Sequence, residues 1–190
     1  MMSYDPRRLW PRLVLLGLVT VTLQVTTISQ LRVFDTNADL TPLVVASAAL
    51  LCGSLPGAVF GFAVGLFLDL ALVQTVGMSS LLYLSIGYGA GRLRELRDPQ
   101  GAIVPILVGA AATALAQLGF SVMQFLLGKP VPLDPALLRE IVLPVMLGGL
   151  IALPVYALVR RWLLPALPED PRRRRRRAYT TGGLSPLSRA

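Results

Sequence analysis

The 190 residues are 54% hydrophobic and only 15% charged, with a formal net charge of +8. An ordinary globular domain carries about 25% charged residues, so this composition nearly excludes a soluble enzyme. The chain has no histidine, a single cysteine (Cys52) and ten scattered acids, so we predict no catalytic residue, no cofactor and no metal site.

Five uncharged intervals divide the sequence, and they cover residues 13–31, 40–68, 70–91, 99–128 and 141–159. A bilayer core about 30 Å thick needs roughly 20 apolar residues of helix, so each interval is long enough for one span. The interval 40–68 is too long for one span and contains Gly53-Ser54-Leu55-Pro56-Gly57, a pattern typical of a turn. We therefore predict an all-α integral membrane protein, a bundle of six transmembrane helices, with spans at about 10–31, 40–52, 57–76, 78–91, 103–127 and 138–164.

The second predicted span is the shortest. Residues 40–52 make roughly 20 Å of helix, which fits either a short span or a re-entrant segment. Asp39 and Asp134 stand before predicted helices, and we expect each to act as a helix N-cap at the non-cytoplasmic face. Polar amides at Gln24, Gln74, Gln117 and Gln124 are expected to make hydrogen bonds between helices.

Lysine and arginine near the span ends predict the orientation. With six spans and a cytoplasmic N-terminus, inner segments hold 15 of the 18 basic residues, and outer segments hold only Arg32, Lys129 and Arg139. We predict that both termini are cytoplasmic and that residues 165–190 form a basic, disordered tail. Because an arginine run follows the last span so closely, we expect it to contact anionic lipid rather than nucleic acid. The expected contacts are Arg172, Arg173, Arg174, Arg175, Arg176 and Arg177.

The third predicted helix combines small residues with an acid. Gly57, Gly61 and Gly65 recur every four residues, so they share one helix face on which another backbone can approach closely. Two interpretations are open: packing against helices of the same chain, or docking of another protein. Asp69 is the only ionisable residue between Asp39 and Arg92. A charge within a span costs at least about 2.5–3.5 kcal/mol, so Asp69 is either functional or near the outer interface, reaching water or an amide.

Three segments resemble a known family. Residues 38–53 begin with A-D-L-T-P, residues 57–70 read G-A-V-F-G-F-A-V-G-L-F-L-D-L, and residues 87–93 read G-Y-G-A-G-R-L. Together they resemble the bacterial rod shape-determining protein MreD family, from about Trp10 to Trp162. The arginine-rich tail lies outside the resemblance, and Ala38 stands where the family often has proline.

The resemblance implies a non-enzymatic scaffold in the bacterial inner membrane that takes part in rod-shape determination and lateral peptidoglycan synthesis. Its implied partners are MreC, bound directly, with MreB and the RodA–penicillin-binding-protein synthase at the level of the complex. It also implies a fold similar to the substrate-capture subunits of energy-coupling-factor transporters. The implied helix-packing or partner-contact positions are Gly57, Gly61, Gly65, Asp69, Gly87, Gly91 and Arg92.

Two other functions compete with the scaffold. A substrate-capture subunit of a vitamin transporter would share the implied fold, but residues 13–31 lack the A-x-x-x-A docking face that such subunits often carry. An intramembrane hydrolase or transferase would have to work without histidine or paired acids, which leaves Asp69 as its last candidate.

Overall fold

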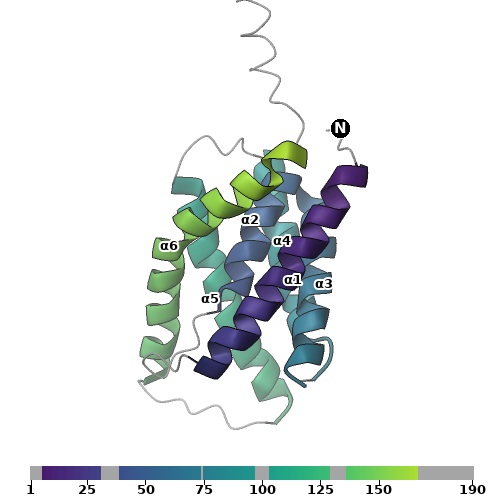
Figure 1. The fold of residues 1–190 in the computed structure, drawn as a ribbon. Coiled ribbons are helices and arrows are strands. Elements are labelled where there is room, and N and C mark those ends of the chain that lie inside the picture. Colours follow the sequence, from purple (N-terminus) through teal and green to yellow (C-terminus); the bar gives the residue numbers. More distant parts are fainter. Residues whose placement is uncertain (1–5, 31–38, 74, 97–102, 129–135, 167–190) are drawn as a thin grey trace, which may run out of the picture.

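The computed structural model describes residues 6–30, 39–73, 75–96, 103–128 and 136–166, and within these ranges all regular structure is helical. Each of the six segments predicted to be helical contains one α-helix (Figure 1). The elements are α1 (Pro6–Gln30), α2 (Thr41–Cys52), α3 (Ser54–Ala71), α4 (Met78–Leu96), α5 (Ile103–Leu126), α6 (Ala136–Leu163) and a short 3-10 helix, η1 (Leu164–Ala166).

The short helix α2 lies at the centre of the bundle and contacts each of the other five α-helices. All of its twelve residues except Val44 are buried. A helix that is apolar on every side has no preferred outer face, so it is stable where other helices surround it completely. At about 1.5 Å per residue, α2 is roughly 18 Å long. The other five helices therefore surround a central helix that is shorter than the apolar core of a bilayer is thick.

The break between α2 and α3 is shorter than the sequence predicts. Only Gly53 separates the two helices, and it adopts a positive φ of 101°, a conformation that glycine reaches without steric cost. Helix α3 begins at Ser54, three residues before the predicted start at Gly57. Pro56 therefore lies in the first turn of α3, where its missing N–H has no helical partner to lose.

Helices α1 and α6 meet at the end of the bundle where α1 begins. In Figure 1, α6 changes direction along its length, and its second part crosses that end instead of following the bundle axis. Pro144 and Pro154 both lie inside α6. An interior proline removes a backbone donor and crowds the carbonyl four residues back, which bends a helix. The Arg12 guanidinium of α1 donates a hydrogen bond to the Trp162 carbonyl at the end of α6, at 3.5 Å.

Four helices are long enough and apolar enough to cross a membrane, namely α1, α3, α5 and α6. Helix α2 is apolar but short, and α4 carries charges near its end. The chain is thus a multi-pass membrane protein with four candidate spans among the described residues. The count of six spans remains a prediction for α2 and α4.

Candidate functional site

The glycines singled out in the sequence face one another across α3 and α4. We call them the glycine seam: Gly57, Gly61 and Gly65 on α3, with Gly87 and Gly91 on α4. A Cβ added at Gly61 would overlap the Tyr83 carbonyl of α4, and one at Gly65 would stand 2.6 Å from the Ser79 carbonyl. Such approaches leave no room for a side chain, because real Cβ atoms do not come this close to backbone atoms.

The seam is reciprocal. A Cβ at Gly87 would overlap the carbonyl of Gly57, and one at Gly91 would overlap the backbone of Ser54. Helix α2 closes the third side, since a Cβ at Gly57 would also lie 2.5 Å from the Ala49 side chain. The glycine face of α3 therefore packs against helices of the same chain, which is the first of the two interpretations.

Asp69 links α3 to the start of α4. Its side chain is fully buried, and its two oxygens accept hydrogen bonds from the backbone N–H groups of Gly77, at 2.8 Å, and Ser79, at 3.3 Å. The first N–H groups of a helix have no partner within the helix and carry a partial positive charge, which favours a carboxylate there. Gly77 has a φ of 101°, which turns its N–H toward Asp69 without strain. Asp69 thus caps α4 from the neighbouring helix.

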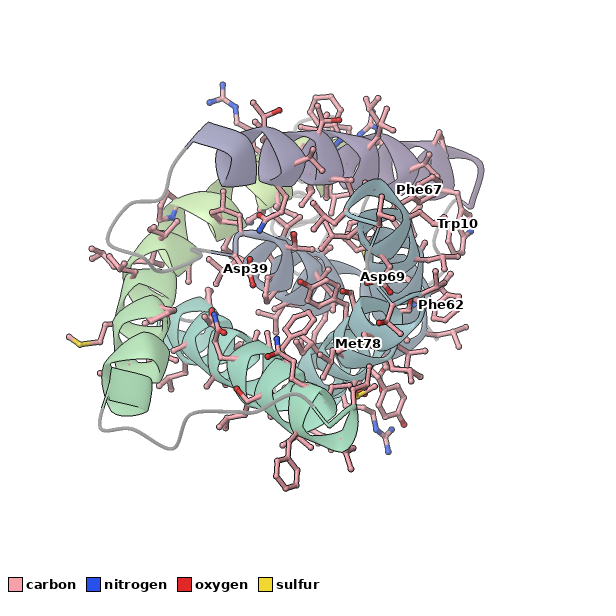
Figure 2. All side chains as sticks on the ribbon, turned by 90° about the horizontal axis from the view of Figure 1, so that it is seen from below. Trp10, Asp39, Phe62, Phe67, Asp69 and Met78 are labelled. Atoms are coloured by element: carbon pink, nitrogen blue, oxygen red, sulfur yellow. The ribbon has the colours of Figure 1, made fainter. Side chains whose placement is uncertain are left out.

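Figure 2 shows Asp69 on the inner side of α3, while Phe62 and Phe67 point away from the bundle. The two phenylalanines are 42% and 61% exposed, whereas Asp69 has no exposed surface. The burial of Asp69 excludes contact of its carboxylate with water in this structure. The amide expected as a partner of Asp69 is present: its carboxylate binds two backbone N–H groups, those of Gly77 and Ser79.

The opposite end of the hairpin carries a cluster of charges. The Glu95 carboxylate of α4 accepts hydrogen bonds from the Ser54 hydroxyl, at 2.6 Å, and the Ser54 backbone N–H, at 3.2 Å. Arg92 lies 3.5 Å from Glu95 in an exposed ion pair, and Arg94 donates to the Leu51 carbonyl at the end of α2. The hydrogen bonds from Ser54, followed by the charge of Arg92, lower the pKa of Glu95. The cluster secures the one-residue break between α2 and α3.

A second polar connection joins α1 to the start of α2. The Gln24 amide donates to the Asp39 carboxylate at 2.7 Å, and its oxygen accepts from the Leu40 N–H at 3.2 Å. The prediction that Asp39 caps α2 is wrong, because the cap residue is Leu40 and no side chain bonds to the first turn. Asp39 turns instead toward Gln24, whose side chain is only 2% exposed and must find polar partners. Burial raises the pKa of Asp39 from 3.8 to about 6.

Two of these interactions were not predicted from the sequence. The sequence predicted that Gln24 makes a hydrogen bond between helices, but it did not indicate that Asp39 is the partner. It gave no indication of a role for Glu95. Ser54 opening a helix after glycine is a weak local signal, and its bond to Glu95 spans 41 residues. Asp134, Gln74 and Arg172–Arg177 lie outside the described residues. Among the described residues, no cluster of acids and cysteines is placed to hold a metal ion.

Comparison with known proteins identifies a family for the chain. The fold and the contacts define a class of protein: an all-α, multi-pass membrane protein. It is built around a buried central helix and a close-packed helical hairpin. The family model of the rod shape-determining protein MreD matches residues 7–162, and the chain belongs to this family. Members are non-enzymatic membrane proteins with a role in rod-shape determination. Neither a curated protein nor a solved structure matches the chain.

Proposed function

We propose that this protein is a scaffold of the cell-elongation machinery that binds MreC directly. It associates with MreB and the RodA–penicillin-binding-protein synthase at the level of the complex, and so supports lateral peptidoglycan synthesis. Membership of the MreD family over residues 7–162 is the observation that carries the proposal. The vitamin-transporter alternative gains no specific support from the contacts described above.

The short connections support a scaffold that works through its helix faces. No connection between successive helices is longer than ten residues, which is too short to fold as a domain. Partners must then meet the outer faces of the helices or the ends of the bundle. Exposed apolar side chains on the outer face of α3, such as Val59, Phe62 and Phe67, offer one such surface. We assign the seam glycines to helix packing, which holds this surface in place.

The orientation is part of the same proposal. We propose six spans with both termini in the cytoplasm and a fold like that of the transporter substrate-capture subunits. Support comes from the start of α1 and the end of α6, which lie at the same end of the bundle (Figure 1) and are joined by the bond from Arg12 to Trp162. Cysteines placed in residues 97–102 and 129–135 of a Cys52→Ala variant test it. A membrane-impermeant thiol reagent on intact cells should label only the second group.

Depletion and crosslinking test the function. In a rod-shaped bacterium that depends on this gene, depletion should round the cells, and affinity purification of the protein should recover MreC. A photo-crosslinker at Phe62 or Phe67 should form an adduct with MreC, and matched positions on the exposed face of α5, Leu115 and Leu118, serve as the comparison. Normal rods after depletion, together with no recovered MreC, would contradict the proposal. Adducts at α5 alone would move the contact surface away from α3.

A further inference from the structure

Pro154 is the second of the two prolines inside α6. We call residues 154–163 the α6 end segment. It crosses the end of the bundle at which α1 begins (Figure 1), and the bond from Arg12 to the Trp162 carbonyl fixes it beside α1. A helix that runs across the end of a membrane bundle lies near the plane of the bilayer surface rather than along its normal. The span of α6 then consists of its residues before Pro154, 136–153, which make about 27 Å of helix.

The inner face of this segment is apolar and buried. Val159 and Leu163 are 1% and 0% exposed, and Ala152, just before the segment and two turns before Val159, is 2% exposed. Val155 and Tyr156 are partly buried against the same core. These positions follow the spacing of one helical face, so the segment rests on the bundle as an amphipathic helix does.

The outer face combines two kinds of side chain that rarely share a water-exposed surface. Leu158 and Trp162 are 69% and 47% exposed, and Arg160 and Arg161, which come between them in the sequence, are exposed as well. Leu164 in η1 continues the apolar part and is 53% exposed. Within the described part of the chain, neither Arg160 nor Arg161 has an acidic partner.

The boundary between headgroups and acyl chains suits such a face. Tryptophan concentrates at this level of the bilayer, because its ring is apolar and its N–H is a donor. Arginine can lay its stem along apolar surface and bring its charge to a phosphate, where two parallel N–H donors match two oxygens. If the face met only acyl chains, the charges of two adjacent arginines would be placed in an apolar medium at a high cost in free energy. If it met only water, Leu158 and Trp162 would have no apolar contacts.

We propose that the α6 end segment is an interfacial helix whose Arg160 and Arg161 bind the phosphate headgroups of anionic phospholipids, with Leu158 and Trp162 inserted beside the acyl chains. The site is separate from the arginine run at 172–177, because its cations are carried by a helix packed on the bundle. Charge complementarity selects an anionic over a zwitterionic lipid at this position.

The depth of two reporters tests the geometry. Trp10 and Trp162 are the two tryptophans of the chain, so Trp10→Phe leaves Trp162 as a single fluorophore. A second variant, Trp10→Phe/Leu158→Trp/Trp162→Phe, moves the fluorophore by one helical turn. In vesicles with lipids brominated at shallow or deep acyl positions, an interfacial helix gives both reporters the same shallow depth. A helix along the bilayer normal would separate them by about 6 Å, and that result would overturn the proposal.

Lipid selectivity tests the chemistry. For the Trp10→Phe protein, brominated phosphatidylglycerol should quench Trp162 more strongly than brominated phosphatidylcholine at the same mole fraction. Adding Arg160→Gln and Arg161→Gln should lower the apparent selectivity at least about fivefold, the effect of one or more neutralised surface charges. The matched control, Arg32→Gln/Arg139→Gln, removes the same charge from segments predicted at the opposite face and should change the selectivity less than twofold.

Two outcomes overturn the assignment of the headgroup. An unchanged selectivity in the Arg160→Gln/Arg161→Gln protein would show that these cations do not bind lipid. A Trp162 that no brominated lipid quenches would show that protein, not lipid, covers the segment. Tm measured on each variant shows that it is folded, since glutamine keeps the helical propensity of both positions close to that of arginine.

Discussion

Two helix pairs in this protein approach closely through small residues, but the atoms that meet are different. Between α3 and α4, a Cβ added to a seam glycine meets backbone, as at Gly61 with the Tyr83 carbonyl. Between α5 and α6, a Cβ added at Gly148 meets a side chain that can rotate, the Thr113 hydroxyl at 2.5 Å, whereas one at Gly109 meets the Ala152 methyl, which cannot. A side chain can turn to another rotamer, whereas two packed backbones can separate only by moving whole helices.

We therefore expect the α3–α4 hairpin to be rigid and the α5–α6 pair to adjust more easily. Helices α3 and α4 are joined by backbone packing, capped at one end by Asp69 and tied at the other by Glu95. At Gly148, helices α5 and α6 meet through a contact that a rotamer change of Thr113 can relieve. Gly61→Leu, Asp69→Asn and Gly148→Ala test this contrast, and Asp39→Asn tests the polar connection between α1 and α2.

Gly61→Leu should destabilise the protein by at least about 3 kcal/mol, because no rotamer removes the overlap of its Cβ with the Tyr83 carbonyl. The expected result is loss of monodisperse protein after detergent extraction, or a large fall in Tm. Gly89→Leu on α4 is the control, since an added Cβ there has nothing within 4 Å. Equal yields and equal Tm values for the two variants would show that the seam is not tightly packed.

Asp69→Asn should lower stability by about 2 kcal/mol, since the side chain keeps one acceptor oxygen for two backbone donors and loses its charge. The fall in Tm measured by calorimetry in detergent checks this. Ser79→Ala is a suitable companion, because it keeps the backbone N–H that Asp69 binds. If Asp69→Asn leaves Tm unchanged but abolishes support of rod shape, a functional role for the carboxylate replaces the structural one.

The connection between α1 and α2 should respond to pH. Asp39 has a pKa of about 6 in the folded protein and 3.8 as its ordinary value, so it holds a proton more tightly when folded. Its contribution to stability is complete below about pH 4 and is lost as the pH rises through 6. Asp39→Asn should therefore raise stability by about 1–2 kcal/mol at pH 7.5. At pH 4 the Tm values of the two proteins should coincide.

A constant difference in Tm between wild type and Asp39→Asn across this pH range would mean that Asp39 does not titrate near 6. Gln24→Leu gives a second measurement on the same connection. It removes the donor to Asp39, so the pH dependence should remain while the stability falls at every pH.

Gly148→Ala should have the smallest effect, about 1 kcal/mol or less. The Thr113 hydroxyl donates to the Gly109 carbonyl at 3.0 Å, and turning it away relieves the contact at the loss of that hydrogen bond. Gly148→Ala/Thr113→Ala should regain part of the lost Tm. A loss as large as that of Gly61→Leu would remove the contrast between the two helix pairs.

Local patterns in the sequence predicted the helices well. Bounds differ from the prediction by a few residues, as for α3, which begins at Ser54, and for α4, which continues to Leu96. Polar contacts were harder to predict. Asp39 has the position of a helix cap, but the buried amide of Gln24 in α1 competes for it. The partner lies 15 residues away, and no local spacing indicates it.

Hydropathy, glycine spacing and family motifs determined by themselves that the chain is a multi-pass helical membrane protein of the MreD family, because these signals lie within single helices and need no partner. Only the tertiary structure decided that the glycine face turns inward onto α4, that Asp69 caps a neighbouring helix, and that α6 ends across the bundle. Each of these depends on which helices become neighbours. Packing between distant segments settles that choice, and the same local pattern is compatible with more than one neighbour.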